Sequence, residues 1–296
     1  MSLPQRIAIT GASGLIGTAL IGHLKSEGHT VQRLVRRPVV SADEIQWDPS
    51  AGTVDLNALE GVDAVIHLAG VNVGDKRWSK KYKAEILNSR LLGTTTIANA
   101  VNAVKPQVFI SASAIGWYGE SGNRSVVETD RVGDDFLAAV CREWEGAADL
   151  VTDVRTVKIR TGLVLDPTGG ALGRMLPLFR LGLGGKLGNG KQWWSWITLH
   201  DVIRAITFLL ENKVSGPVNL TSPNPVTNQE FTSALARAMH RPALFPAPAI
   251  ALKIALGGFS SEILGSKKVT PQALADAGFT WDYPHITNAL TALIQE

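Results

Sequence analysis

A glycine-rich loop near the N-terminus constrains the fold of this chain more than any other feature. Residues 6–10 form an apolar run of strand length, residues 11–17 read Gly-Ala-Ser-Gly-Leu-Ile-Gly, and a helix-period segment follows. In that context Gly11 permits a tight turn, Gly14 lets the backbone approach a pyrophosphate, and Gly17 lets the helix pack closely on the strand. The free N–H groups of the helix then face a phosphate, a role that an ordinary strand–helix turn lacks. The loop predicts a dinucleotide site that includes Gly11, Ser13, Gly14, Leu15, Ile16 and Gly17.

Apolar runs of strand length alternate with amphipathic segments of helical length through the first half of the chain. The strand-like runs lie at residues 31–35, 64–68, 108–111 and 154–159, and the helical segments at 15–27, 80–104 and 135–149. Unbroken apolar runs are typical of parallel strands that are buried on both faces. The order of elements therefore predicts an α/β fold, a Rossmann doubly wound parallel sheet.

The amino-acid composition of the chain changes after residue 165. Glycine and proline gather at residues 166–173 and 182–190, with short helical segments between them. A strand and helix at 197–210 and a strand at 217–221 look like returns to the first unit. The sequence predicts a Rossmann domain of residues 1–165, with 195–222 returning to it, and a smaller, interleaved C-terminal lobe made of 166–194 and 223–296.

Charge and cysteine content narrow the classes of partner. The net charge is +3 over 296 residues and like charges do not cluster, so neither a nucleic-acid arm nor a membrane patch is indicated. A small, acidic molecule is the better match. The single cysteine, Cys141, cannot form an internal disulfide, and no secretory or membrane-spanning apolar segment is seen, so we expect a cytoplasmic protein. The oligomeric state is not indicated.

The second predicted strand ends in arginines where an NAD-binding protein usually has an acid. About twenty residues after the glycine loop, an NAD site places Asp or Glu on the ribose hydroxyl, whereas residues 31–37 here read Val-Gln-Arg-Leu-Val-Arg-Arg. A guanidinium can hold a 2′-phosphate through two parallel hydrogen bonds. The sequence therefore favours NADP over NAD, with Arg36 as the better placed arginine, Arg37 beside it and the Ser13 hydroxyl as a further donor. The alternative is that these arginines only solvate a strand end.

Two further segments follow strands on the same side of the predicted sheet. Asp48 ends a short third strand, where its carboxylate can accept a hydrogen bond from an adenine amine, and Leu68, Ala69 and Gly70 follow the fourth. Ligands of open α/β sheets bind at the carboxyl ends of the strands. Both segments are therefore predicted to contact the cofactor.

These motifs together resemble the extended short-chain dehydrogenase/reductase superfamily, and more narrowly its sugar-nucleotide epimerase-like branch. The resemblance covers nearly the whole chain. It rests on Thr10-Gly11-x-x-Gly14-x-x-Gly17, on His67-Leu68-Ala69-Gly70 and on Ser111-Ala112-Ser113, with matching later segments at residues 160–164, 196–202 and 217–220. It implies that the segment beginning at Arg160 passes the nicotinamide, so Arg160 is counted among the cofactor-binding residues.

The catalytic pair of that family is missing here. The family uses a tyrosine and a lysine four residues on, and the lysine helps to lower the tyrosine pKa for proton exchange. When Glu145 is aligned with the family's usual downstream acid, Leu137 stands at the tyrosine and Cys141 at the lysine. Neither can do that chemistry, and a lone cysteine within a helix is more often a core residue than a nucleophile. The chain resembles an atypical subgroup, in which fold alone does not establish a reaction.

The loop after the fifth predicted strand holds two candidates for the missing catalytic chemistry. Ser113 takes the place of the family's Ser or Thr, which polarises a substrate carbonyl, and Tyr118 carries a phenolic proton in the same loop. If Lys76, Arg77 or Lys191 reached Tyr118, its pKa would fall enough for acid–base work. The alternative is that Tyr118 only packs against the substrate.

Two other segments pair cations with indole rings. Lys76 and Trp78 lie in one, Lys191 and Trp194 in the other, and Trp117 lies in the loop after the fifth strand. Cations hold acidic groups and indoles stack on flat rings. Facing each other, the segments would form a pocket for a substrate with an anionic end and an apolar or planar body; the alternative is that the tryptophans join the two lobes. The six histidines are scattered, so no metal site is predicted.

The sequence therefore favours an NADP(H)-dependent enzyme, oxidoreductase-like or epimerase-like, of unidentified substrate. The rival interpretation is a non-catalytic NADP-binding sensor or scaffold protein, for which the missing dyad argues. A protein-interaction module that uses the tryptophan-rich face is a third. A cleft lined by Ser113, Tyr118, Lys76 and Trp194 would favour the enzyme, and a cleft filled by apolar side chains would favour the sensor.

Overall fold

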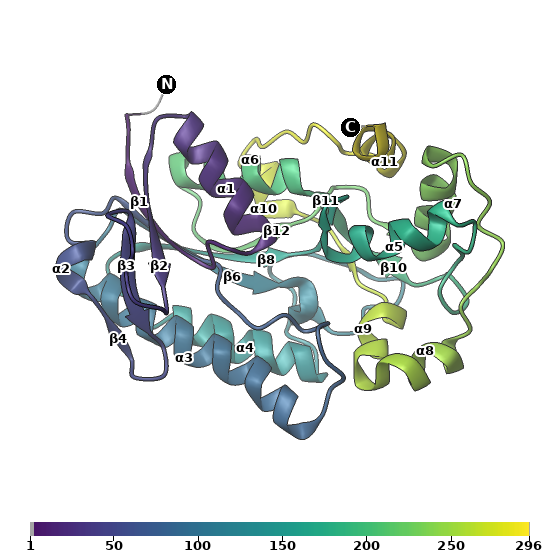
Figure 1. Ribbon diagram of the computed structural model, residues 1–296, viewed down its shortest axis with the longest axis horizontal. Coiled ribbons are helices and arrows are strands. Elements are labelled where there is room, and N and C mark those ends of the chain that lie inside the picture. Colours follow the sequence, from purple (N-terminus) through teal and green to yellow (C-terminus); the bar gives the residue numbers. More distant parts are fainter. Residues whose placement is uncertain (1–2, 296) are drawn as a thin grey trace.

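The computed structural model describes residues 3–295 and is built around an eight-stranded sheet (Figure 1). The strand order is β12-β8-β6-β5-β1-β2-β3-β4, and all neighbours run parallel except β3 and β4. The predicted α/β fold with a doubly wound, Rossmann-type sheet is confirmed. The strands are β1 (Arg6–Thr10), β2 (Thr30–Val35), β3 (Glu44–Asp48), β4 (Thr53–Val54), β5 (Ala64–His67), β6 (Val108–Ala114), β8 (Arg155–Thr161) and β12 (Gly216–Leu220).

Helices cover both faces of this sheet (Figure 1). Side chains alternate along each strand, so Ile7 and Ile9 of β1 pack with the helices of one face, whereas Ala8 packs with those of the other. This two-sided burial explains why the strands read as unbroken apolar runs. The first face carries α1 (Leu15–Ser26) and α6 (Leu199–Glu211), and the second carries α3 (Lys80–Val104) and α4 (Phe136–Ala148).

A second group of helices and small sheets lies at one end of the sheet, on the right of Figure 1. Its own core includes Leu172, Phe179, Trp196, Phe231 and Leu290. Three two-stranded sheets pair β9 (Leu163–Asp166) with β11 (Trp196–Thr198), β10 (Trp193–Trp194) with β13 (Val226–Thr227), and β7 (Ser125–Val126) with β14 (Lys268–Val269). The helices are α5 (Gly170–Arg180), α7 (Asn228–Ala238), α8 (Ala249–Leu256), α9 (Ser260–Leu264) and α11 (Ile286–Gln295).

Short elements complete the chain. They are α2 (Leu56–Leu59), α10 (Gln272–Asp276) and the single turns η1 (Ile115–Tyr118) and η2 (Gly257–Phe259). Within residues 3–295, none of the helices combines the length and apolar character needed to cross a membrane.

The chain passes repeatedly between the main sheet and the second group. β12 pairs in parallel with β8, so the strand predicted at 217–221 does return to the main sheet. β11 pairs in parallel with β9 and not with a strand of the main sheet, while its Ile197 lies in the core of that sheet. The close approach of the chain at Ser195 to the turn between β8 and β9 depends on Gly162, where a Cβ would lie 2.5 Å from the Ser195 oxygen. α6 then packs on the face of the main sheet with α1. The division into 1–165 with 195–222 and the remaining lobe stays a prediction.

Asp201 fastens the C-terminal segment to α6. Its side chain is fully buried, and its oxygens accept hydrogen bonds from Arg204 and from the backbone N–H groups of Asp282 and Tyr283, each at 3.0 Å. Together with His200 and Asp282, it places possible metal-ligand atoms within 4.8 Å of one another. Because Arg204 and two N–H groups already use the Asp201 oxygens, we interpret this cluster as structural.

Replacing Asp201 by Ala should lower the free energy of unfolding by about 1–3 kcal/mol, because the partly buried N–H groups of Asp282 and Tyr283 and the Arg204 guanidinium lose their acceptor. Urea unfolding followed by circular dichroism measures the change. Glu143→Ala, at an exposed position of α4, is the control and should stay within about 0.5 kcal/mol of the parent. A loss no larger than that of the control would show that the C-terminal segment is held by other contacts.

Candidate functional site

The glycine loop between β1 and α1 is shaped for close approach of a ligand to the backbone. Gly11 has a φ of +70°, and a Cβ there would lie 2.8 Å from the carbonyl carbon of Leu68. A Cβ at Gly17 would lie 2.2 Å from the Gly11 oxygen, so the helix packs on the loop only because residue 17 is glycine. Gly14 caps α1 without a side-chain hydrogen bond, and Ser13 beside it is exposed. The first-turn N–H groups are therefore placed to bind an anion.

Thr10 and His67 hold the predicted segment 68–70 beside this loop. The Thr10 hydroxyl accepts hydrogen bonds from the N–H groups of Leu68 at 3.1 Å and Ala69 at 3.3 Å, so its own proton points to His67 Nδ1 at 2.8 Å. His67 is fully buried, and burial lowers its pKa to about 3, so the imidazole is neutral. Sequence reasoning missed this role of Thr10, for which the available signal was a hydroxyl at the end of an apolar strand.

The arginines after β2 have different surroundings. Arg33 pairs with Asp43 at 3.0 Å and Glu44 at 3.1 Å, and Arg37 pairs with the same Glu44. The Arg37 guanidinium already has a carboxylate partner, and this contact lowers the pKa of Glu44, while the predicted contact of Arg37 with the cofactor stays a prediction. Arg36 is exposed, and its side chain makes no ion pair or hydrogen bond within residues 3–295. Arg36 is thus the arginine left for an anionic ligand.

Asp48 ends β3 as predicted, but its carboxylate is engaged in the turn that follows. Oδ1 accepts hydrogen bonds from the Ser50 hydroxyl, from the Ser50 N–H at 2.8 Å and from the Ala51 N–H at 3.3 Å. These bonds, those from Ser50 foremost, lower the pKa of Asp48. These three hydrogen bonds all use Oδ1, so the predicted contact with an adenine amine would use the other carboxylate oxygen, Oδ2.

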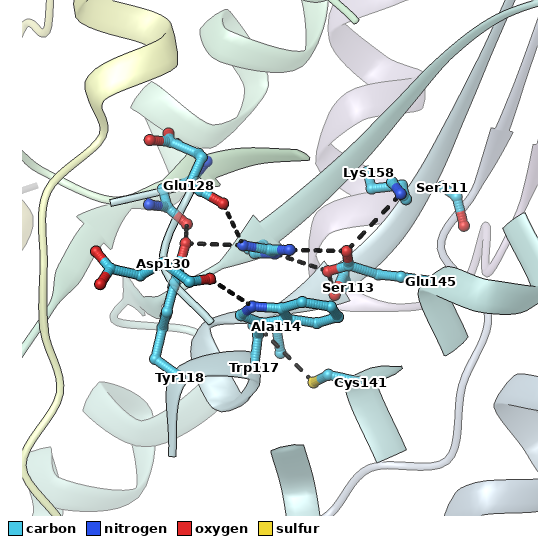
Figure 2. A network of polar contacts seen from close by, with 12 residues as sticks. Ser111, Ser113, Ala114, Trp117, Tyr118, Glu128, Asp130, Cys141, Glu145 and Lys158 are labelled. Atoms are coloured by element: carbon cyan, nitrogen blue, oxygen red, sulfur yellow. Dashed lines mark hydrogen bonds and ion pairs between the residues drawn. The ribbon is translucent and has the colours of Figure 1, made fainter. Parts of the chain in front are cut away.

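A buried polar network lies beside the helix that lacks the dyad (Figure 2). Arg160 on β8 and Glu145 on α4 form a two-point ion pair, with Nε–Oε1 at 2.7 Å and Nη2–Oε2 at 2.9 Å. The two residues are only 2% and 3% exposed. Ser113 donates to Glu145 Oε1 at 2.7 Å, and the Trp117 ring lies 4.0 Å from Arg160 Cζ. The predicted catalytic serine is therefore bonded to a carboxylate that is itself paired with an arginine.

Tyr118 joins the same network through its hydroxyl. It donates to Asn219 Oδ1 at 2.7 Å and accepts from Arg160 Nη1 at 3.0 Å. Burial raises the pKa of Tyr118 to about 12, although the neighbouring Arg160 acts in the opposite direction. Glu128 braces this arrangement, because its side chain accepts from the Asn219 N–H and its backbone oxygen accepts from Arg160, both at 3.0 Å. The structure thus brings together Ser113, Tyr118 and Arg160, while sequence reasoning missed Glu128 and Asn219.

The geometry bears on two expectations about this network. Arg160, predicted to contact the cofactor, directs four hydrogen bonds of its guanidinium into the protein, and its contact with the cofactor stays a prediction. The cation beside Tyr118 is Arg160, and the condition for a lowered Tyr118 pKa is not met. The three cations expected to supply it all have exposed side chains and do not bond to Tyr118: Lys76, Arg77 and Lys191.

Leu137 and Cys141, at the positions of the family's dyad, pack against η1. A Cβ at Gly116 would lie 3.3 Å from Leu137 Cβ and 3.4 Å from Cys141 Sγ. The thiol faces the Ala114 oxygen at 3.6 Å, and burial raises the pKa of Cys141 to about 12. Both side chains therefore serve as packing groups, and the thiol is not an activated nucleophile.

The two tryptophan-containing segments both contact the stretch formed by η2 and α9. The Trp78 ring packs on Phe259, with centroids 5.9 Å apart. Trp194 reaches the Ile263 oxygen at 3.4 Å. The expectation that the segments face each other across one cleft stays a prediction, and their shared neighbour is a segment that sequence reasoning did not single out.

The loop, the parallel sheet and the buried network are those of a Rossmann-type α/β protein without the usual Tyr–Lys dyad. Residues 7–135 match the NAD dependent epimerase/dehydratase family, and residues 247–293 match a domain of unknown function (DUF1731). An epimerase family protein of Mycobacterium leprae is 44% identical over 289 residues, which cover 96% of this chain and 94% of the relative. The chain belongs to this epimerase family, as an atypical extended short-chain dehydrogenase/reductase.

More distant relatives extend the comparison. The chloroplastic SDR39U1 homolog of Arabidopsis thaliana is 36% identical over 309 residues, covering 98% of this chain and 86% of the relative. The crystal structure of human epimerase family protein SDR39U1 with NADPH has a TM-score of 0.91 at 32% identity, covering 98% of this chain and 99% of the human one. A nucleoside-diphosphate sugar epimerase from Corynebacterium glutamicum has a TM-score of 0.79 at 34% identity, covering 99% of this chain and 59% of the other. The family resemblance predicted from the motifs is confirmed.

The Tyr118 phenol should remain protonated well beyond the range of an ordinary tyrosine. Its pKa is raised to about 12, against about 10 in an unfolded chain. Between these values the unfolded state releases the proton and the folded state keeps it, so this stabilising contribution is complete below pH 10 and is lost as the pH rises towards 12. Ultraviolet titration of tyrosinate absorbance should show a late step that Tyr118→Phe abolishes. A late step that persists in this variant would assign it to Tyr82 or Tyr283 instead.

Proposed function

We propose that this protein binds NADP(H) at the carboxyl ends of β1, β2 and β5. The observation that carries the proposal is the combination of the tight glycine loop with Arg36, the exposed arginine after β2 whose side chain has no partner among residues 3–295. The glycines leave room for a pyrophosphate and the first turn of α1 offers N–H donors. The presence of NADPH in the structure of the human relative supports the same choice of cofactor.

Each part of the proposed cofactor site has a distinct role. The Gly11–Gly17 loop holds the pyrophosphate, Arg36 and the Ser13 hydroxyl hold the 2′-phosphate, and the 68–70 segment fixed by Thr10 borders the cofactor. Bound nicotinamide would supply hydride transfer. Because Arg33 and Arg37 are held by Asp43 and Glu44, selectivity for NADP over NAD falls on Arg36.

Arg36→Gln should weaken NADPH binding by roughly 10–100-fold, the loss expected for charged hydrogen bonds to one phosphate. NADH binding should change little, since NADH has no 2′-phosphate. Fluorescence titration of both cofactors measures the two affinities. Arg142→Gln, at an exposed position on α4, is the matched control. Equal loss of NADPH and NADH binding would contradict the role given to Arg36.

In the same proposal the protein is an oxidoreductase-like or epimerase-like enzyme acting on a small, anionic molecule. Its membership of the epimerase family supports this choice. Proton exchange would not proceed through Tyr118, since this hydroxyl is bonded to Asn219 and Arg160. The second candidate is a non-catalytic NADP(H) sensor or scaffold. The observation that favours it is the burial of Ser113 and Tyr118, each 4% exposed, inside a network with its own partners.

Turnover separates the two candidates. We expect NADPH oxidation with one class among small carbonyl compounds and sugar nucleotides, followed by absorbance. On that substrate Tyr118→Phe should keep its rate within a few-fold, whereas loss of a general acid costs about a hundredfold or more. A drop of that size would return Tyr118 to the mechanism. Tight NADPH binding without turnover on any class would favour the sensor.

A further inference from the structure

A wide-open surface cavity of about 510 Å³ lies between the nucleotide-binding part and the 247–293 segment. The first wall consists of Trp78, Lys83 and Phe136, at the start of α3 and α4. The second wall comes from the end of α8, from η2 and from α9. Its volume is within the range of sites for small molecules. Phe136 on this wall directly precedes Leu137, the residue at the position of the family's tyrosine, in the first turn of α4.

The charge on the cavity wall is of one sign. Lys83 and Lys253 line it, and no carboxylate is among the described residues that do so. The nearest acidic residue on α9, Glu262, is engaged by Lys267 at 3.0 Å. Neither lining lysine forms an ion pair within residues 3–295. The wall therefore carries positive charge without a protein counter-ion, which favours an anionic occupant.

The apolar part of the cavity wall is aromatic and flat. Lys83 Nζ lies 4.7 Å from the Phe136 ring centre and 5.5 Å from that of Trp78, so the ammonium is held over both rings. The Trp78 and Phe136 rings meet edge to face at 5.1 Å. A ligand whose anionic group reaches Lys83 would bring its body against these rings.

Two adjacent glycines let the second wall approach the first. A Cβ at Gly257 would lie 2.6 Å from Arg77 Nε, and a Cβ at Gly258 would lie 3.2 Å from Trp78 Cε3. Gly257 also has a φ of +58°, which side chains rarely adopt. The 247–293 segment is thus fitted closely to the Trp78 side of the cavity, and Arg77 binds it through the Ile254 oxygen at 3.1 Å.

We propose that the 247–293 segment serves as the second wall of a binding site for a small anion with a flat, apolar body, in which Lys83 and Lys253 hold the anionic group and Trp78 and Phe136 the body. This inference rests on the proposed function, because it names the class of molecule that would meet the cofactor site. The site assigns a task to the segment that matches the domain of unknown function.

The test compares naphthoate with its neutral analogue naphthamide by calorimetric titration of the full chain. Wild type should bind naphthoate more tightly. Lys83→Gln and Lys253→Gln should each weaken naphthoate binding about tenfold, the loss of one charged contact, and change naphthamide binding by less than about twofold. Lys213→Gln, an exposed position after α6, is the matched control and should behave as wild type. NADPH is titrated into the same proteins, and its affinity should be unchanged in all three variants.

The outcomes separate this inference from the proposed function. Equal binding of naphthoate and naphthamide by wild type, or equal effects of the cavity variants and Lys213→Gln, would overturn the anion site. Selective naphthoate binding lost in the lysine variants, with no NADPH binding by wild type, would support the site and overturn the proposed function. Loss of NADPH affinity in Lys83→Gln would show that the anion held there belongs to the cofactor, and would overturn the inference.

Discussion

The ion pair between Arg160 and Glu145 holds four elements of the protein in one arrangement. Removing two charges from water costs several kcal/mol for each ion, and only good geometry with additional hydrogen bonds offsets that cost. Here Glu145 receives two bonds from Arg160 and one from Ser113, while Arg160 also reaches Tyr118 and the Glu128 oxygen. Because these groups come from β6, η1, β8 and α4, displacing any of the elements would expose an unpaired charge to an apolar interior.

The same arrangement explains what occupies the two positions of the missing dyad. Leu137 and Cys141 fill space against η1, and η1 in turn presents Trp117 and Tyr118 to Arg160. A proton on Ser113 already points to a carboxylate, and the Tyr118 proton points to an amide oxygen. Both hydroxyls are therefore hydrogen-bonded within the network in the structure.

Sequence patterns predicted the structural features that depend on residues close together in the sequence. The β1 strand, the glycine turn and α3 follow from local periodicity and backbone sterics, and the structure contains each of them. Strand alternation ranked Arg36 above Arg37, but it did not predict the ion pair of Arg37 with Glu44, which reaches Arg37 across the β2–β3 connection. Whether the Arg160 guanidinium is free for a ligand depends on Glu145, which comes from α4. The burial of this pair follows only from the assembled sheet. Long-range pairing of charges is what local patterns do not encode.

The wall formed by residues 247–264 differs physically from the rest of the molecule. None of the residues in α8 is buried, and Ile250 and Ile254 are 74% and 69% exposed. Its contacts with the first wall are confined to one side, where Gly257 and Gly258 lie against Arg77 and Trp78, Arg77 donates to the Ile254 oxygen and Trp78 packs on Phe259. Segments with few buried apolar contacts open locally at low free-energy cost, and ligand-binding elements are drawn from them. In the proposed anion site, the exposed α8 would let the second wall adjust to its ligand, whereas the Arg160 network keeps the sheet and α4 in one arrangement.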